Sequence, residues 1–212
     1  MSTYATDTDL LLWEPNLPAE AAIASQTLLS GSADLSGTTL TIAAGSLAAA
    51  HVEPDQVVAL SGSITGCYPI ISIESATQMT ISILYAGTWP DVDPPVPSPV
   101  GAVAGVSFAI RSFYPQRRVI SDLLDRIIDL PAGVTLLNPD VLRRPCALGT
   151  IQMIYSALAA AVDAPEIHQI RCDLYERLYR RALRDVVLHL DTLGDGRIHE
   201  IRRLGVLQLT RG

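Results

Sequence analysis

The chain has 212 residues, and hydrophobic residues make up 49% of it, which is enough for one large core or two small ones. All 15 basic residues are arginine, which excludes chemistry that needs a lysine, such as a Schiff base or a P-loop phosphate contact. The formal net charge of −7 disfavours tight binding of a phosphate backbone.

Charge is unevenly distributed along the chain. Residues 1–116 carry ten acidic side chains and one arginine, whereas residues 117–212 carry twelve acidic side chains and fourteen arginines. No apolar run approaches the roughly 18 residues of a membrane span, and the acidic first twelve residues lack the basic region of a secretory signal. We therefore expect a protein made in the cytoplasm that has no membrane partner.

The first segments of the chain favour helix. Thr6–Asp9 offers capping and acidic side chains before an apolar run that Pro15 ends. Pro18 suits the first turn of a second helix, predicted over 18–29, and Ser30–Ser32 stops it.

Between residues 35 and 113 glycine, serine and threonine become frequent and apolar residues alternate with polar ones. The pattern predicts five short strands, which together favour a small antiparallel barrel or sandwich. Pro69, in the third, indicates a sheet edge or a bulge. The predicted strands are 39–42, 57–60, 68–73, 79–83 and 106–110.

A proline-rich loop, 90–99, precedes the last predicted strand. Five prolines in these ten residues favour extended polyproline geometry. We interpret the loop either as a plain spacer or as a functional arm that contacts a partner. In the second case Trp89, Pro94 and Pro95 are the candidate contact residues.

Helical periodicity returns after Pro115. Asn138 and Pro139 are predicted as the cap and first residue of a helix that runs to about Val162, and its part 148–161 is apolar almost all round, as in a central buried helix. A last long helix follows from about 163. The predicted inner face of the 119–128 helix is Val119, Ile120, Leu123, Leu124, Ile127 and Ile128. The predicted inner face of the last helix is Ile167, Ile170, Leu174, Leu178, Val186 and Leu190.

The last helix also carries many arginines among acidic residues. Acid-before-base pairs four residues apart stabilise a helix by only about 0.2–0.5 kcal/mol each, so this face is either solvated and self-paired or an interface with an acidic partner. The candidate interface residues are Arg177, Arg180, Arg181 and Arg184.

The tail from Ile201 to Leu209 is strand-like and has no partner strand next to it in the sequence. It either closes onto an edge within the chain or adds to an edge on a partner protein. The candidate contact residues are Leu204, Val206, Leu207 and Leu209.

Catalytic and metal-binding motifs are weak. Asp191, Asp195 and Gly196 partly match a calcium loop, but Leu193 stands where an oxygen ligand is needed and the glutamate at the end of the loop is missing. Three widely spaced cysteines indicate neither a zinc site nor a disulfide framework. We predict no enzyme, no cofactor and no metal, with Asp191 and Asp195 as the weak metal candidates.

The elements together predict an α+β fold. The expected architecture is a bundle of four to five helices, 1–34 with 114–212, carrying an inserted small antiparallel β-barrel or sandwich, 35–113, and a C-terminal strand-like tail.

Three sets of motifs stand out in the helical regions. They are Tyr4–Leu11 with Glu14–Asn16, Leu137–Pro139 with Leu142–Arg144 and Ala147–Thr150, and Asp191–Gly196 with Arg202–Val206 and Leu209. Together they resemble the head–tail connector, or adaptor, proteins of tailed bacteriophages. The resemblance covers roughly 1–30 and 113–212, and 35–113 departs from the simple all-helical adaptor.

The resemblance implies a structural protein of the virion neck with a part in viral genome packaging. Adaptors of this family form a homo-oligomeric ring, usually a dodecamer, between the portal protein and the tail or a stopper or terminator protein. Double-stranded DNA passes through the ring without sequence recognition. The alternative is a binding module whose β-domain docks a tail protein or a carbohydrate.

Overall fold

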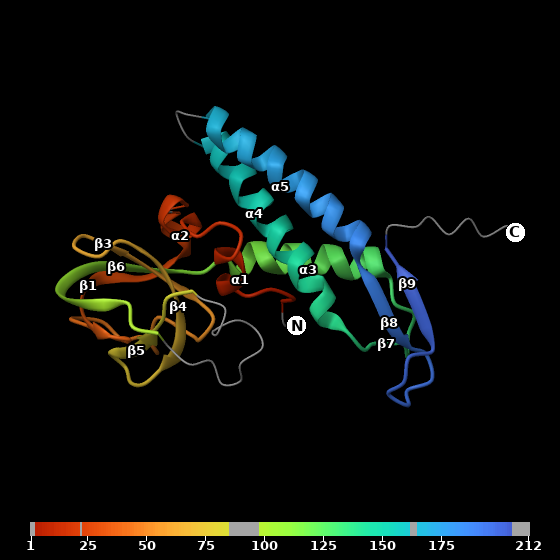
Figure 1. Ribbon diagram of the computed structural model, residues 1–212, viewed down its shortest axis with the longest axis horizontal. Helices are drawn as coiled ribbons and strands as arrows, with labels where there is room; N and C mark the ends of the chain where they lie inside the picture. Colours follow the sequence, from red (N-terminus) through yellow and green to blue (C-terminus); the bar gives the residue numbers. More distant parts are fainter. Residues whose placement is uncertain (1–2, 22, 85–97, 162–164, 205–212) are drawn as a thin grey trace, which may run out of the picture. The chain divides into compact units, whose positions relative to one another are not determined.

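The computed structural model describes residues 3–21, 23–84, 98–161 and 165–204. They belong to two compact units, one formed by Thr6–Phe113 and the other by Met1–Ala5 with Tyr114–Gly212 (Figure 1). Within the described ranges every helix is too short or too polar to cross a lipid bilayer.

The predicted fold class, a helical bundle with an inserted barrel or sandwich, is wrong. Thr6–Phe113 is built around a closed barrel of six antiparallel strands, and the first two helices belong to this barrel unit rather than to a bundle. The other unit contains three long helices and a sheet of its own. The sequence pattern missed this division because a short helix that packs on a barrel has the same apolar periodicity as one that packs in a bundle.

The barrel closes in the strand order β1-β2-β5-β4-β3-β6, with β6 pairing antiparallel to both β3 and β1. The five predicted strands overlap β2 to β6, and β1 was not predicted. Pro69 lies inside β4 beside a register shift between Ile70 and Ser72, so it marks an irregularity in the ladder and not an edge. The strands are β1 Thr27–Gly37, β2 Thr39–Ile42, β3 Val57–Ser61, β4 Gly66–Ile73, β5 Gln78–Ile81 and β6 Gly101–Arg111.

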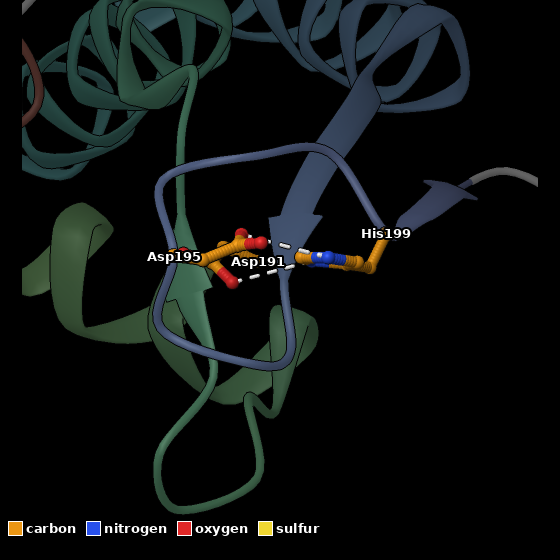
Figure 2. A group of neighbouring side chains, drawn as sticks. All are labelled: Asp191, Asp195 and His199. Atoms are coloured by element: carbon orange, nitrogen blue, oxygen red, sulfur yellow. Dashed lines mark ion pairs between the residues drawn. The ribbon is translucent and has the colours of Figure 1, made fainter.

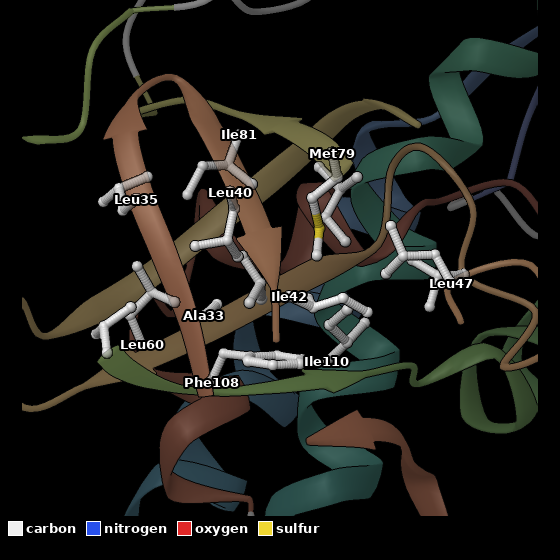
Figure 3. Close-up of a cluster of buried hydrophobic side chains, with 14 residues drawn as sticks. Ala33, Leu35, Leu40, Ile42, Leu47, Leu60, Met79, Ile81, Phe108 and Ile110 are labelled. Carbon is white, nitrogen blue, oxygen red and sulfur yellow. The ribbon is translucent and has the colours of Figure 1, made fainter. Parts of the chain in front are cut away.

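The barrel interior is filled by side chains. Alternate residues of the strands point inward, and Leu47 and Val52 join them from the segment between β2 and β3 (Figure 3). Gly31 of β1 lies directly opposite Phe108 of β6, whose ring atom Cε1 is 3.5 Å from the position that a Cβ of Gly31 would occupy. The phenyl ring thus lies beside a strand position that has no side chain of its own.

Helix α1, Asp7–Leu11, starts with a capping box between Thr6 and Asp9, as the sequence predicted. The buried carboxylate of Asp7 accepts a hydrogen bond from the backbone N–H of Phe113 at 3.0 Å. Helix α2 is only Leu17–Glu20, so the predicted helix 18–29 is wrong: a 3₁₀ turn, η1 Ala24–Gln26, leads directly into β1.

The helical unit has α4 at its centre, as the sequence predicted, because α4 packs against both α3 and α5. Gly149 of α4 makes this approach possible: a Cβ there would lie 3.1 Å from both Ile120 of α3 and Tyr179 of α5. The helices are α3 Tyr114–Ile128, the 3₁₀ helix η3 Pro139–Leu142, α4 Arg143–Ala161 and α5 Pro165–Asp185.

Residues at the N-terminus of the chain are fixed to α3. The guanidinium of Arg117, which is buried, donates to the carbonyl of Ala5 at 2.6 Å and to the Thr3 hydroxyl at 2.9 Å. The backbone N–H of Tyr4 donates to Ser121 at 3.1 Å, and its phenol donates to Asp125.

A small antiparallel sheet of order β7-β8-β9 completes the helical unit. The last helix ends at Asp185, so Val186 and Leu190 are not on its inner face as predicted. Part of the expected tail, from Ile201 to Arg203, lies in β9 and pairs with β8, the preceding strand, so the prediction that the tail has no partner strand next to it in the sequence is wrong. The strands are β7 Thr135–Leu136, β8 Val187–Asp191 and β9 Glu200–Arg203.

Candidate functional site

The predicted arginine cluster is exposed on the C-terminal half of α5. Arg180 forms a 2.5 Å ion pair with Glu176 one turn earlier, whereas no hydrogen bond or ion pair joins Arg177, Arg181 or Arg184 to another described residue. These three arginines are four and three residues apart, so they lie on one face of the helix.

The same face of α5 is apolar in its N-terminal half. Ile167, Ile170 and Leu174 are 60%, 68% and 43% exposed, so their predicted place on the inner face is wrong. The helix packs inward through Cys172 and Ala182 instead. We call the outward face the α5 seam, since its residues follow the three- and four-residue spacing of a coiled-coil stripe. The α5 seam consists of Ile167, Ile170, Leu174, Arg177, Arg181 and Arg184.

Helix α3 has a second unpaired apolar face. Ile120, Leu124 and Ile128 are buried as predicted. The other half of the predicted inner face points outward, because Val119, Leu123 and Ile127 are 52%, 41% and 42% exposed. They lie one turn apart on a single line along the helix, which we call the α3 face.

The loop between β8 and β9 brings the two weak metal candidates together with a histidine (Figure 2). His199 Nδ1 is 3.3 Å from Asp191 Oδ1, and His199 Nε2 is 3.5 Å from Asp195 Oδ1. One ligand atom from each residue lies within 4.8 Å of the others. His199 was not among the metal candidates predicted from the sequence, because a four-residue spacing from Asp195 brings side chains together only in a helix and this segment is a loop.

The carboxylate of Asp191 already has protein donors. Its Oδ1 accepts the backbone N–H groups of Leu193 and Gly194 at 3.0 and 2.7 Å, and its Oδ2 accepts that of Gly196 at 2.7 Å. Burial acts to raise the pKa of Asp191, but the backbone donors together outweigh it and hold that pKa below its ordinary value. A cation would compete with these N–H groups for the same oxygens, so the contacts support a structural turn better than a metal site.

Asn138 precedes the first residue of η3, Pro139, as predicted, but its side chain makes no capping hydrogen bond. Its side-chain amide donates to the carbonyl of Val187 at 2.9 Å and accepts the N–H of His189 at 2.8 Å. Both partners belong to β8, so the Asn138 side chain adds two hydrogen bonds to the edge of β8 beyond its pairing with β7. A shallow pocket of about 330 Å³ lies beside it, lined also by Arg144 and Asp185.

Cys146 and Cys172 are buried, and Cys67 is partly exposed. Burial raises the pKa of the thiols of Cys146 and Cys67, which keeps both in the neutral form that is a poor nucleophile.

Several predicted contact residues lie outside the described part of the chain. Leu204, the last described residue, is half-buried and donates its N–H to Val186 at 3.3 Å. The residues outside are Trp89, Pro94, Pro95, Val206, Leu207 and Leu209.

Comparison with protein-family models, with curated proteins and with solved structures finds no match to this chain. The α5 seam and the α3 face each join several exposed apolar side chains into one stripe. Contiguous exposed stripes of this kind are typical of protein–protein contacts, whereas single exposed aliphatic residues are not.

Proposed function

We propose that this chain is a structural head–tail adaptor of a tailed phage. In this proposal copies of the chain form a ring in the virion neck, between the portal protein and the tail or a stopper or terminator protein. The observation that carries the proposal is the pair of outward apolar faces on the helical unit, the α5 seam and the α3 face. Monomeric proteins rarely expose contiguous apolar patches such as these six aliphatic side chains aligned on two helices.

The charges of the two units support assembly. The only formally positive side chain in Thr6–Phe113 is Arg111, whereas exposed acids of that unit include Asp34, Glu53 and Glu74. Arg181 and Arg184 carry unpaired positive charge on the α5 seam. An acidic surface on a neighbouring copy or on the portal would pair with them. A net charge of −7 also suits a conduit through which DNA passes without being held.

The alternative function, a β-domain that docks a carbohydrate, finds little support among the described residues. Sugar binding uses exposed aromatic faces, but Phe108 and Phe113 are 4% and 1% exposed and Tyr68 is partly buried. Contact between the barrel unit and a tail protein remains compatible with the adaptor role.

The test is reconstitution with the portal protein encoded by the same phage. We expect negative-stain images of the purified mixture to show an added ring of density on the portal. Arg181→Glu combined with Arg184→Glu should reduce this complex, while Arg197→Glu, an exposed arginine on the β8–β9 loop, should not. A chain that neither binds the portal nor alters its images would refute the proposal.

A further inference from the structure

We infer that the ring is built by a head-to-tail contact in which the α5 seam of one copy packs parallel to the α3 face of the next copy. This inference rests on the proposed function and names the surfaces that join the subunits. The occupant of each face is thus a second copy of this chain.

The apolar parts of the two faces match in length. Ile167 to Leu174 and Val119 to Ile127 each span two turns of helix, about 10–12 Å at 1.5 Å per residue. Each stripe presents three aliphatic side chains that are 41–68% exposed. Packing one stripe against the other removes both from water, which neither helix achieves within its own unit.

The flanking charges set the direction of the contact. Exposed Glu166 precedes the apolar stripe of α5 and Arg177 follows it, whereas exposed Arg118 precedes the stripe of α3 and Asp129 follows it. Parallel packing pairs Glu166 with Arg118 and Arg177 with Asp129. Antiparallel packing brings Glu166 against Asp129 and Arg177 against Arg118, which places like charges together at both ends.

Pairing of α5 with a second α5 is unfavourable. A parallel pair aligns Arg177, Arg181 and Arg184 with their own copies, and an antiparallel pair sets these arginines against the apolar stripe. An antiparallel pair of α3 helices does satisfy its charges, but it leaves the α5 seam exposed. It also yields a closed two-fold dimer, whereas a contact between two different surfaces repeats from copy to copy and forms a ring when the rotation between copies closes.

Complementary variants separate these arrangements. Leu174→Asp disables the α5 seam and leaves the α3 face intact, and Leu123→Asp does the reverse. Both residues are exposed, at 43% and 41%, so folding measured by far-ultraviolet circular dichroism should be unchanged. Leu174→Ala and Leu123→Ala replace them if either aspartate variant fails to fold.

We expect the unmodified chain to form oligomers in analytical ultracentrifugation at concentrations up to about 1 mM. A contact that is not populated at that concentration has a dissociation constant weaker than about 1 mM. Each variant alone should sediment as a monomer. An equimolar mixture should form a dimer of twice the 22.7 kDa chain mass and nothing larger, because only one intact seam and one intact face remain in each pair.

Charge exchange tests the parallel direction. Arg177→Asp alone and Asp129→Arg alone should each weaken oligomer formation about three- to fivefold, as expected for an exposed ion pair. An equimolar mixture of the two should regain affinity at every contact that joins the two reversed residues.

The outcomes distinguish the inference from the proposed function. A Leu174→Asp variant that still forms dimers while Leu123→Asp does not would indicate the two-fold α3 pair and overturn the inference. An unmodified chain that stays monomeric at about 1 mM also overturns it. Neither result touches portal binding, whose failure in the reconstitution experiment counts against the adaptor function itself.

Discussion

The Asn138→Ala substitution should lower the free energy of unfolding of the helical unit by about 2 kcal/mol. Asn138 makes two hydrogen bonds to the backbone of β8, at 2.9 Å to Val187 and 2.8 Å from His189. Each such bond contributes about 1 kcal/mol net. Val187 and His189 are both half-buried, so water can hydrogen-bond to part of the backbone that the substitution exposes. The loss per hydrogen bond therefore stays near the lower end of the roughly 1–3 kcal/mol for an unsatisfied buried group.

The Asn138→Asp substitution separates the sheet contact from a helix cap. Aspartate and asparagine cap helices about equally well, so a capping role predicts little change. In the sheet contact an aspartate can still accept the N–H of His189, but its second oxygen faces the carbonyl of Val187, and two acceptors repel each other. We therefore expect Asn138→Asp to destabilise the unit at least as much as Asn138→Ala does.

Urea and thermal unfolding followed at 222 nm measure this effect, because all three long helices belong to the helical unit. A loss of about 2 kcal/mol in a unit of roughly 100 residues lowers the melting temperature by about 10 °C. An Asn138→Asp variant as stable as the unmodified chain would refute the reasoning and return Asn138 to the role of a cap.

Three further predictions concern other parts of the molecule. In an NMR titration the Asp191 carboxyl should have a pKa below its ordinary value. The ionised carboxylate therefore stabilises the fold at pH values above the unfolded-state pKa, and this contribution is lost as the pH falls through the folded-state pKa. An unshifted pKa would contradict this prediction. Gly149→Val should lower the free energy of unfolding by about 2 kcal/mol, because α3 and α5 lie 3.1 Å from the added carbon; the exposed Ser156→Val on the same helix is the control, and equal effects would rule out tight packing. Phe108→Ala should cost about 3–5 kcal/mol in an unfolding experiment followed by tryptophan fluorescence, since both tryptophans of the chain belong to the barrel unit; a loss under 1 kcal/mol would mean that the barrel collapses around the cavity.

The strands of the barrel with regular alternation were predictable from the sequence, and β1 was not. Its only buried residues are Ala33 and Leu35, and Ser30, Gly31 and Ser32 before them are exposed, so the contrast between apolar and polar residues is too low to detect. What makes this segment a strand is its pairing with β6, including the contact of Gly31 with Phe108. That partner is far away in the sequence, and local patterns do not report it.

The end of the last helix was mispredicted for a related reason. Val186 and Leu190, four residues apart, continue the apolar pattern of α5, but together with Leu188 they also fit a strand with alternating burial. The choice between the two is made by β7 and β9, which pair with β8 on either side. Neither strand is strong enough in sequence to be recognised alone, since β7 has only two residues.

The candidate interface was predictable in residue type and only partly in position. The sequence pointed to Arg177, Arg181 and Arg184, and all three are exposed. Helical periodicity also identified the apolar stripes of α3 and α5, but it cannot tell whether a stripe is buried within its own chain. Leu123 and Leu174 belong to these stripes and are exposed.

Closure of the barrel has a kinetic consequence during synthesis. The strands that complete it, β1 and β6, are its first and last in the chain, with Gly31 paired to Phe108. At about 5–20 residues per second the ribosome needs roughly 4–15 s to supply the second partner after the first. The edge of β1 that pairs with β6 therefore has no partner strand during that time. Helices α4 and α5 are neighbours in the sequence and can associate as soon as both have been synthesised.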